Sequence, residues 1–208
     1  MASVNSPPFT SFEPGPAWEI ARLFPDQGDL SEDDYLLLTE HTNRMAEFTD
    51  GKIEVLPMPT PEHQEIVWFL MSALRAFVTS GSLGRALMAP LRVRIAEGRF
   101  REPDVVFVSA KNASRQGKRY WEGVDLVMEV VSDDCPKRDL IDKRRDYAAA
   151  EIAEYWIVDP RSRKIMILKL KNRRYAMHSE ATGSGTVESG LLRGFSVDVA
   201  AVFAAAKG

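Results

Sequence analysis

The chain has 208 residues, of which 45% are hydrophobic and 27% are charged. This length suits one domain of roughly 150 residues with appendages, and the composition disfavours disordered, collagen-like and coiled-coil proteins. The one cysteine, Cys135, cannot form an internal disulfide. No apolar run reaches the roughly 18 residues of a membrane span, and the first residues lack a signal-peptide pattern, so we expect a cytoplasmic protein.

The net charge of −3 is unevenly distributed along the chain. Residues 1–63 contain 3 Lys and Arg against 12 Asp and Glu, which gives −9, so residues 64–208 carry +6. Eight cations lie in one basic segment, namely Arg92, Arg94, Arg99, Arg101, Lys111, Arg115, Lys118 and Arg119. Such a segment forms either an ordinary solvated face or a surface that holds a phosphate backbone.

The N-terminal part of the chain changes character near Ser31. Residues 1–30 contain five prolines without periodicity and predict a flexible arm. Ser31 and Asp34 then have the spacing of a capping box at the start of a short helix. Further on, residues 44–48 and 52–56 flank an Asp-Gly pair, which predicts a β-hairpin.

The best-defined helix is expected from Pro61 to Thr79. Thr60 supplies an N-cap, Pro61 suits the first helical position, and Gly81 can end the helix. Apolar residues recur within it at steps of three and four, which predicts one broad buried face. Four short strands are expected next, over residues 85–88, 91–95, 103–108 and 125–131. The last two are almost continuously apolar, as in strands covered on both faces.

A helix over residues 139–150 and a strand over residues 153–158 follow. The order strand, helix, strand is a crossover unit, so part of the sheet should be parallel. A hairpin turned at Asn172 and a short helix over residues 197–205 complete the chain. We therefore predict a single α/β or α+β domain over residues 31–208, with a central mixed β-sheet.

Two of the predicted buried strands contain a carboxylate. Asp104 begins one, and Glu129 interrupts the other. An unpaired charge in such a strand is energetically costly. If the strands are neighbours, the two carboxylates can converge at one edge of the sheet and bind Mg²⁺ or Mn²⁺. The alternative is that each carboxylate pairs with a nearby arginine, such as Arg92 or Arg94.

Lys143 lies on the helix after the strand of Glu129. It follows Asp139 by four residues and precedes Tyr147 by four, so the three share one face. If this helix packs on the sheet, the ammonium can orient or deprotonate a water and stabilise charge at phosphorus. The alternative is an ordinary surface lysine. Other chemistries lack their signals, because there is no Gly-rich phosphate loop, no zinc-type cluster and no histidine close to Cys135 in the sequence.

Taken in order, these motifs resemble the Uma-type family of restriction endonucleases, within the PD-(D/E)XK nuclease superfamily. The matching stretches are Glu47 before Asp50-Gly51, PTPEHQEIV, EPDVVFV, DLVMEVVSDD, Asp139 with Lys143 and Tyr147, and EYWIVDP. The resemblance covers about residues 33–203. It implies a restriction-endonuclease-like fold with an αβββαβ core and helices flanking the central sheet.

The resemblance also implies a set of site residues. Asp104 and Glu129 match the two acidic ligands of a divalent cation, and the carbonyl of Val130 matches a further ligand. At Val131 the superfamily pattern has a lysine, and in this family a lysine of the following helix, here Lys143, takes its place.

Two further residues match the family pattern. Glu47 corresponds to a glutamate in the first hairpin that would ligate the metal through water. His63 corresponds to a helix-start histidine that would either assist proton transfer or only cap the helix. His41 and His178 match nothing and are expected at the surface.

The residues and the resemblance together predict a Mg²⁺- or Mn²⁺-dependent DNA endonuclease. A homodimer is expected by analogy, since a duplex has two strands to cut. One alternative is a catalytically impaired nucleic-acid-binding or assembly module of the same fold. It is favoured by the valine at position 131, where the superfamily pattern has a lysine, and by the acidic net charge. Another is a metal-dependent enzyme acting on a small phosphate ester.

Overall fold

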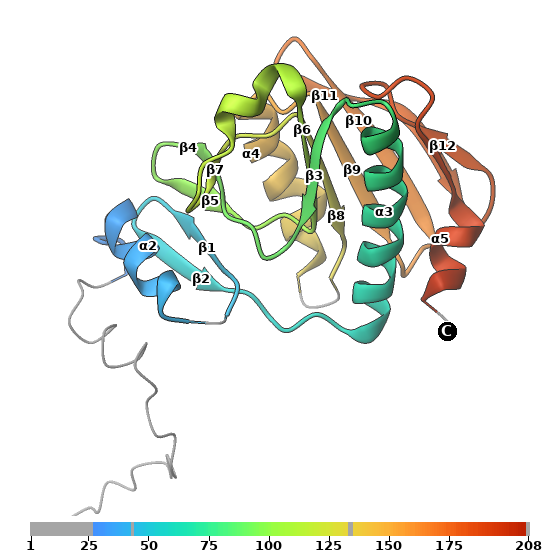
Figure 1. Ribbon diagram of the computed structural model, residues 1–208. Coiled ribbons are helices and arrows are strands. Elements are labelled where there is room, and N and C mark those ends of the chain that lie inside the picture. The colour runs from blue at the N-terminus through green and yellow to red at the C-terminus, as the bar shows by residue number, and fades with distance from the viewer. Residues whose placement is uncertain (1–26, 43, 133–134, 207–208) are drawn as a thin grey trace, which may run out of the picture.

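A six-stranded mixed sheet lies at the centre of the molecule (Figure 1), with the strand order β11-β10-β9-β8-β6-β3. The computed structural model describes residues 27–42, 44–132 and 135–206, so most of the predicted N-terminal arm lies outside the described residues. The strands are β3 (Gly84–Met88), β6 (Val105–Ser109), β8 (Leu126–Val130), β9 (Glu154–Asp159), β10 (Lys164–Lys171) and β11 (Arg174–Thr182). β8 and β9 are parallel and the other neighbours are antiparallel, which confirms the predicted crossover.

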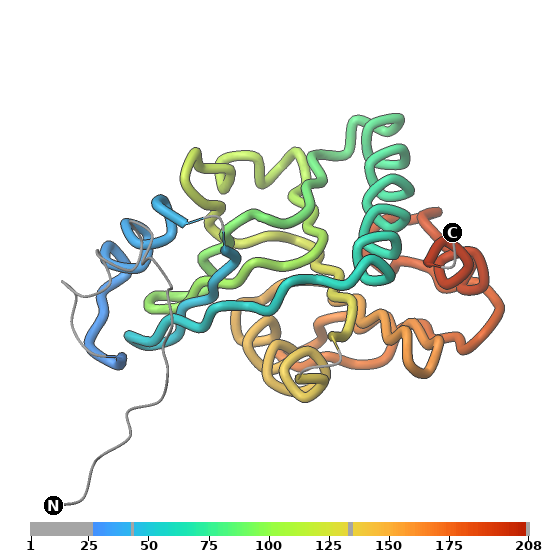
Figure 2. Tube along the Cα trace, turned by 90° about the horizontal axis from the view of Figure 1, so that it is seen from below, coloured from blue at the N-terminus to red at the C-terminus, as the bar shows by residue number. Residues whose placement is uncertain are grey.

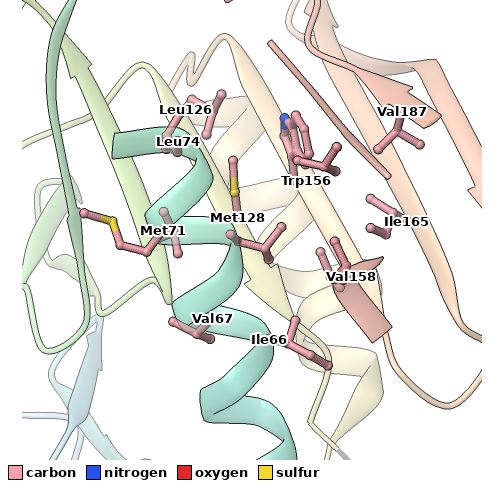
Figure 3. Packing of buried hydrophobic residues seen from close by; sticks show 14 of the residues in the cluster. Ile66, Val67, Met71, Leu74, Leu126, Met128, Trp156, Val158, Ile165 and Val187 are labelled. Atoms are coloured by element: carbon pink, nitrogen blue, oxygen red, sulfur yellow. The ribbon is translucent and has the colours of Figure 1, made fainter. Parts of the chain in front are cut away.

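Helices cover both faces of this sheet. α3 (Pro61–Ser80) and α5 (Val199–Ala205) pack on one face, and α4 (Lys143–Ala149) packs on the other. Figure 2 shows α3 and α4 on opposite sides of the sheet. Along β8, Leu126 and Met128 belong to the core beneath α3 (Figure 3), whereas Val127 belongs to the core beneath α4. β8 is therefore apolar on both faces, as its sequence predicts.

In chain order, α3, β3, β6, β8, α4 and β9 form the expected αβββαβ core. The predicted caps of α3 are confirmed. The hydroxyl of Thr60 accepts a hydrogen bond from the N–H of His63 at 3.2 Å, Pro61 opens the helix, and Gly81 is the C-cap residue. The helix thus begins at a fixed position beside the end of the central sheet. This placement matters because His63 lies in its first turn.

A second sheet, with the order β2-β1-β5-β4-β7, lies beside the core. Its strands are β1 (Ala46–Thr49), β2 (Lys52–Val55), β4 (Val93–Ala96), β5 (Arg99–Arg101) and β7 (Trp121–Glu122). The hairpin β1-β2 was predicted, whereas β5 and β7 were not, because they have only three and two residues. α2 (Glu32–Glu40) begins with the predicted capping box of Ser31 and Asp34. Figure 2 shows α2 and the hairpin at the opposite end of the molecule from α5.

The last residues of the predicted arm contact this hairpin. The side-chain amide of Gln27 donates to the carbonyl of Ile53 at 3.1 Å, and the N–H of Gly28 donates to the carbonyl of Gly51 at 2.8 Å. Gly51 has a φ of 83°, and a Cβ built there would lie 2.2 Å from the Gly28 oxygen. Only glycine permits this close approach.

Shorter elements complete the fold. They are the 3₁₀-helix η1 (Ala110–Arg115), the π-helix η2 (Arg138–Asp142), and a small sheet of β12 (Thr186–Glu188) and β13 (Ser196–Asp198). The helix predicted over residues 139–150 is therefore a π-helix that continues into α4. No helix in the described part of the chain is both long enough and apolar enough to cross a bilayer.

The buried carboxylate of Glu154 fastens the C-terminal segment to the central sheet. It accepts hydrogen bonds from the indole of Trp156 at 2.7 Å and the hydroxyl of Ser189 at 2.6 Å. The N–H groups of Gly190 and Leu191 donate to it at 2.6 and 2.8 Å. One side chain thus accepts hydrogen bonds from four donors on two segments of the chain.

We predict that Glu154→Ala destabilises the protein by roughly 3 kcal/mol, because buried donors that lose their acceptor cost about 1–3 kcal/mol each. Urea unfolding followed by circular dichroism measures this change. Glu151→Ala serves as the control, because the ion pair of Glu151 with Arg173 is exposed and should contribute little. Equal unfolding midpoints for the two variants would contradict the prediction.

Candidate functional site

Asp104 and Glu129 lie at the same end of neighbouring strands. The β6-β8 ladder pairs Val105 with Met128. Continued by one residue, this register places Asp104 opposite Glu129, on the same face of the sheet. The N–H of Val130 donates to Oδ2 of Asp104 at 2.7 Å. The structure therefore brings the two predicted carboxylates together.

The ammonium of Lys143 is buried among three carboxylates. Its Nζ lies 3.0 Å from Oε1 of Glu129, 3.3 Å from Oδ1 of Asp139 and 3.4 Å from Oε1 of Glu47. The hydroxyl of Tyr147, on the same helix face, donates to Oε1 of Glu129 at 2.5 Å. Lys143 is only 5% exposed, so its alternative interpretation as an ordinary surface lysine is wrong.

The π-helix η2 sets the position of Lys143. The N–H of Lys143 donates to the carbonyl of Arg138, five residues earlier, which is the hydrogen bond of a π turn. Asp139, in this turn, and Lys143, immediately after it, contact each other and face the end of β8. Single π turns occur frequently at functional sites.

The charges in this cluster influence one another strongly. Burial alone would lower the pKa of Lys143, but the carboxylates of Glu129, Glu47 and Asp139 outweigh it and raise that pKa well above its usual value. Burial raises the pKa of Glu129; the charge of Lys143 opposes this, and Asp104 and the other carboxylates add to it. Burial also raises the pKa of Asp139. These raised pKa values favour the protonated carboxyl groups, and a divalent cation bound beside them would favour their charged forms.

His63 extends from the first turn of α3 to Asp104. Its Nε2 lies 3.2 Å from Oδ2 of Asp104. Burial lowers the pKa of His63, but the hydrogen bond and charge of Asp104 outweigh burial and raise it, with Glu129 acting in the same direction. The hydroxyl of Thr60, not the imidazole, caps the helix. The alternative that His63 only caps α3 is therefore wrong.

Glu47 connects the site to the second sheet. Its Oε1 accepts a hydrogen bond from the N–H of Glu102 at 3.4 Å, and its Oε2 lies 3.7 Å from Nε of Arg101. Arg101 in turn pairs with Asp146 of α4, at 2.6 Å between Nη2 and Oδ2. Sequence reasoning missed Arg101 and Asp146 as neighbours of the site. The one signal in the sequence was that Arg101 directly follows an aromatic residue, Phe100, which is buried in the structure.

The basic segment is largely neutralised within the chain. Six of its eight cations contact carboxylates, with the pairs Arg92–Glu102, Arg94–Glu32, Arg99–Asp50, Arg101–Asp146, Arg115–Asp125 and Arg119–Glu40. The alternative pairing of Asp104 or Glu129 with Arg92 or Arg94 is therefore wrong. These arginines mainly join elements of the fold, so the segment is not a broad surface of unpaired cations.

The comparisons with known proteins concern the family and the fold of the chain. A family model named Uma2 and described as "Putative restriction endonuclease" matches residues 32–200. The chain belongs to the Uma2 family. The crystal structure of "a putative nuclease belonging to DUF820 from Anabaena variabilis ATCC 29413" has a TM-score of 0.70 and 17% identity, covering 85% of this chain and 99% of that chain. This similarity confirms the restriction-endonuclease-like fold. A search of curated proteins finds no match.

The Uma2 assignment raises the question of a metal ion. Within residues 27–42, 44–132 and 135–206, no group of three or more His, Cys, Asp or Glu side chains is arranged to hold one. The ligand set that the family resemblance implies contains only two such side chains, Asp104 and Glu129, and its third member is the carbonyl of Val130. Asp104 lies beside the N–H of Val130, and Glu129 lies beside Lys143 and Tyr147. Carboxylate and carbonyl oxygens are the donors that Mg²⁺ and Mn²⁺ prefer, so these residues fit such an ion.

The remaining sequence candidates lie at the surface. His41 and His178 are exposed, as predicted, and Cys135 is exposed as well. The candidate site of this Uma2 protein therefore consists of Asp104, Glu129, Lys143, Glu47 and His63, with Asp139 and Tyr147 holding the lysine and glutamate in place.

Proposed function

We propose that this Uma2 protein is a divalent-cation-dependent DNA endonuclease that hydrolyses phosphodiester bonds. The observation that carries the proposal is the convergence of Asp104, Glu129 and Lys143 at one end of the central sheet. Asp104, Glu129 and the carbonyl of Val130 would hold Mg²⁺ or Mn²⁺, which supplies Lewis acidity at the phosphate oxygens when bound.

The role that we assign to Lys143 is electrostatic. An ammonium that contacts three carboxylates remains a cation, so it is poorly suited to act as a general base. Its positive charge would instead orient the attacking water and stabilise the charge that develops on the phosphate. Glu47 would hold this ammonium from the second sheet.

His63 and Asp104 form the side of the site that solvent reaches. Their side chains are 17% and 13% exposed, whereas those of Glu129 and Lys143 are 3% and 6% exposed. A phosphodiester would therefore approach past His63. Because Asp104 orients the imidazole, we assign His63 to proton transfer toward the leaving oxygen.

The proposal includes a homodimer acting in the cytoplasm, because two sites related by symmetry would address the two strands of a duplex. Analytical ultracentrifugation at micromolar concentration would test the dimer. Sedimentation as a monomer in both the presence and the absence of DNA would contradict it.

Supercoiled plasmid is the substrate that tests the activity most directly. Incubation with the purified protein and Mg²⁺ or Mn²⁺ should give nicked and then linear DNA, and EDTA should prevent this. Calorimetric titration with Mn²⁺ in parallel should show binding. Intact plasmid together with no Mn²⁺ binding would contradict the proposal and favour the alternative of an impaired nucleic-acid-binding module, which gel-shift assays would then reveal.

A further inference from the structure

Arg101 is a buried cation of β5 that the proposed mechanism does not use. It is 7% exposed, and its guanidinium lies between the second sheet and α4. Removing a charge from water is costly, and a buried ion pair adds little net stability compared with apolar packing. The contacts of Arg101 therefore call for an explanation beyond the stability of the fold.

On one side, the guanidinium is fixed to β1. Nη1 of Arg101 donates to the carbonyl of Phe48 at 3.2 Å and to the hydroxyl of Thr49 at 2.8 Å. These two residues directly follow Glu47 in the same strand. Arg101 therefore has a defined position relative to the strand that carries Glu47.

On the other side, the guanidinium is bound to α4. Nη2 of Arg101 donates to Oδ2 of Asp146 at 2.6 Å. Asp146 is buried and lies three residues after Lys143, so the two are neighbours on the surface of one helix. Arg101 thus joins the strand that carries Glu47 to the helix that carries Lys143.

Glu47 itself lies between two cations. Its Oε2 is 3.7 Å from Nε of Arg101, and its Oε1 is 3.4 Å from Nζ of Lys143. Within the residues that the structure describes, Nε of Arg101 has no hydrogen-bond partner, so it attracts Glu47 through charge. Without Arg101, both oxygens of Glu47 would turn to Lys143. They would draw its ammonium away from Glu129, which is now 3.0 Å away.

Apolar packing already attaches the two elements that Arg101 joins. In α4, Tyr147 and Ala148 belong to the core on that face of the central sheet. In the second sheet, Phe48 and Phe100 belong to a separate core. Charged hydrogen bonds add fixed directions and distances to this packing. Such constraints are what the alignment of two charged side chains requires.

We infer that Arg101 is a positioning residue, which keeps the ammonium of Lys143 beside Glu129 by acting through Glu47 and Asp146. It does so without contacting the phosphodiester. This inference rests on the proposed function for the hydrolysis that Lys143 serves. The arrangement of the side chains, in contrast, can be measured without substrate or metal.

The first experiment measures plasmid cleavage at saturating Mg²⁺ by variants whose folding is checked by circular dichroism. Arg101→Met should lower kcat about 10- to 100-fold with little change in KM, because it misplaces a catalytic group. Arg101→Lys should also cleave slowly, since one ammonium cannot contact Thr49, Asp146 and Glu47 together. Arg99→Met is the matched control. Arg99 also pairs with Asp146, at 3.3 Å, but in the described part of the chain it does not contact Glu47. This variant should cleave as the wild type does.

A double variant tests whether Arg101 acts through Glu47. If it does, Arg101→Met combined with Glu47→Gln should cleave about as slowly as the slower of the two single variants, because the effects of coupled residues do not add. Losses in kcat that multiply in the double variant would show that the two residues act separately and would overturn the inference.

A crystal structure of Arg101→Met, or of Arg101→Lys if the methionine variant does not fold, shows the arrangement directly. Glu47 should turn toward Lys143, and Nζ should move away from Glu129. An unchanged arrangement, cleavage at the wild-type rate by either variant, or unfolding of both would overturn the inference. A displaced Lys143 in the variant, together with no cleavage by the wild type in any divalent metal, would contradict the proposed function alone.

Discussion

Replacement of Asp104 by asparagine, or of Glu129 by glutamine, is expected to lower plasmid cleavage by about 100- to 1000-fold or more. Each change keeps the size of the side chain and removes one negative charge from the proposed cation ligands. The amide oxygen of asparagine can still accept the hydrogen bond from the N–H of Val130, which is 2.7 Å long in the wild type. The loss in Asp104→Asn should therefore reflect chemistry and not unfolding, whereas Glu129→Gln also removes a charged partner of Lys143, so its fold should be checked by circular dichroism.

Initial rates of plasmid nicking in Mg²⁺ measure this effect, and calorimetric titration with Mn²⁺ should show weaker binding for both variants. Asp33→Asn is the matched control, because Asp33 is an exposed carboxylate on α2. It should cleave as fast as the wild type. Cleavage that survives at the normal rate in both site variants would remove these carboxylates from the mechanism.

Replacement of Lys143 by methionine is expected to destabilise the fold as well as to abolish cleavage. The change leaves Glu129, Asp139 and Glu47 buried without the ammonium that lies within 3.4 Å of each. Removal of one partner from a buried ion pair typically costs about 3–5 kcal/mol. This loss should shrink as the pH falls, because burial raises the pKa values of Glu129 and Asp139 and protonation then neutralises them.

Urea unfolding at several pH values between 6 and 9.5, a range that spans the pKa of about 8 for Glu129, would measure the stability of Lys143→Met. Lys137→Met is the control, because Lys137 is exposed beside the same helix, and it should unfold at the wild-type midpoint. A Lys143→Met protein with wild-type stability at every pH would show that the three carboxylates are not charged together. Such a result would contradict the charge distribution described for the site.

Much of the fold follows from local signals in the sequence. The caps at Thr60 and Gly81 and the Asp-Gly turn each depend on residues that are close along the chain, and all three are confirmed. β5 and β7 could not be predicted, because strands of three and two residues show no periodicity. They form by pairing with longer strands nearby, since β5 pairs with β1 and β4 and β7 pairs with β4.

The site was less predictable than the fold. Asp104 and Glu129 were found because carboxylates in valine-rich strands are unusual, and Lys143 because helical spacing aligns it with Asp139. The partners of the arginines could not be found in this way. Arg101 contacts Asp146 across 45 residues of sequence, and only the folded chain determines which opposite charge is near.

The π-helix η2 has a consequence for the comparison of this chain with its relatives. A π turn contains one residue more than the α turn that would replace it. Loss of one residue between Arg138 and Asp142 would turn the following side chains by about 100° about the helix axis and carry Lys143 away from Glu129. The contact between Glu129 and Lys143 thus depends on the number of residues that separate them as well as on their identities. In an alignment, an intact lysine at the wrong spacing would mark a member that has lost this arrangement.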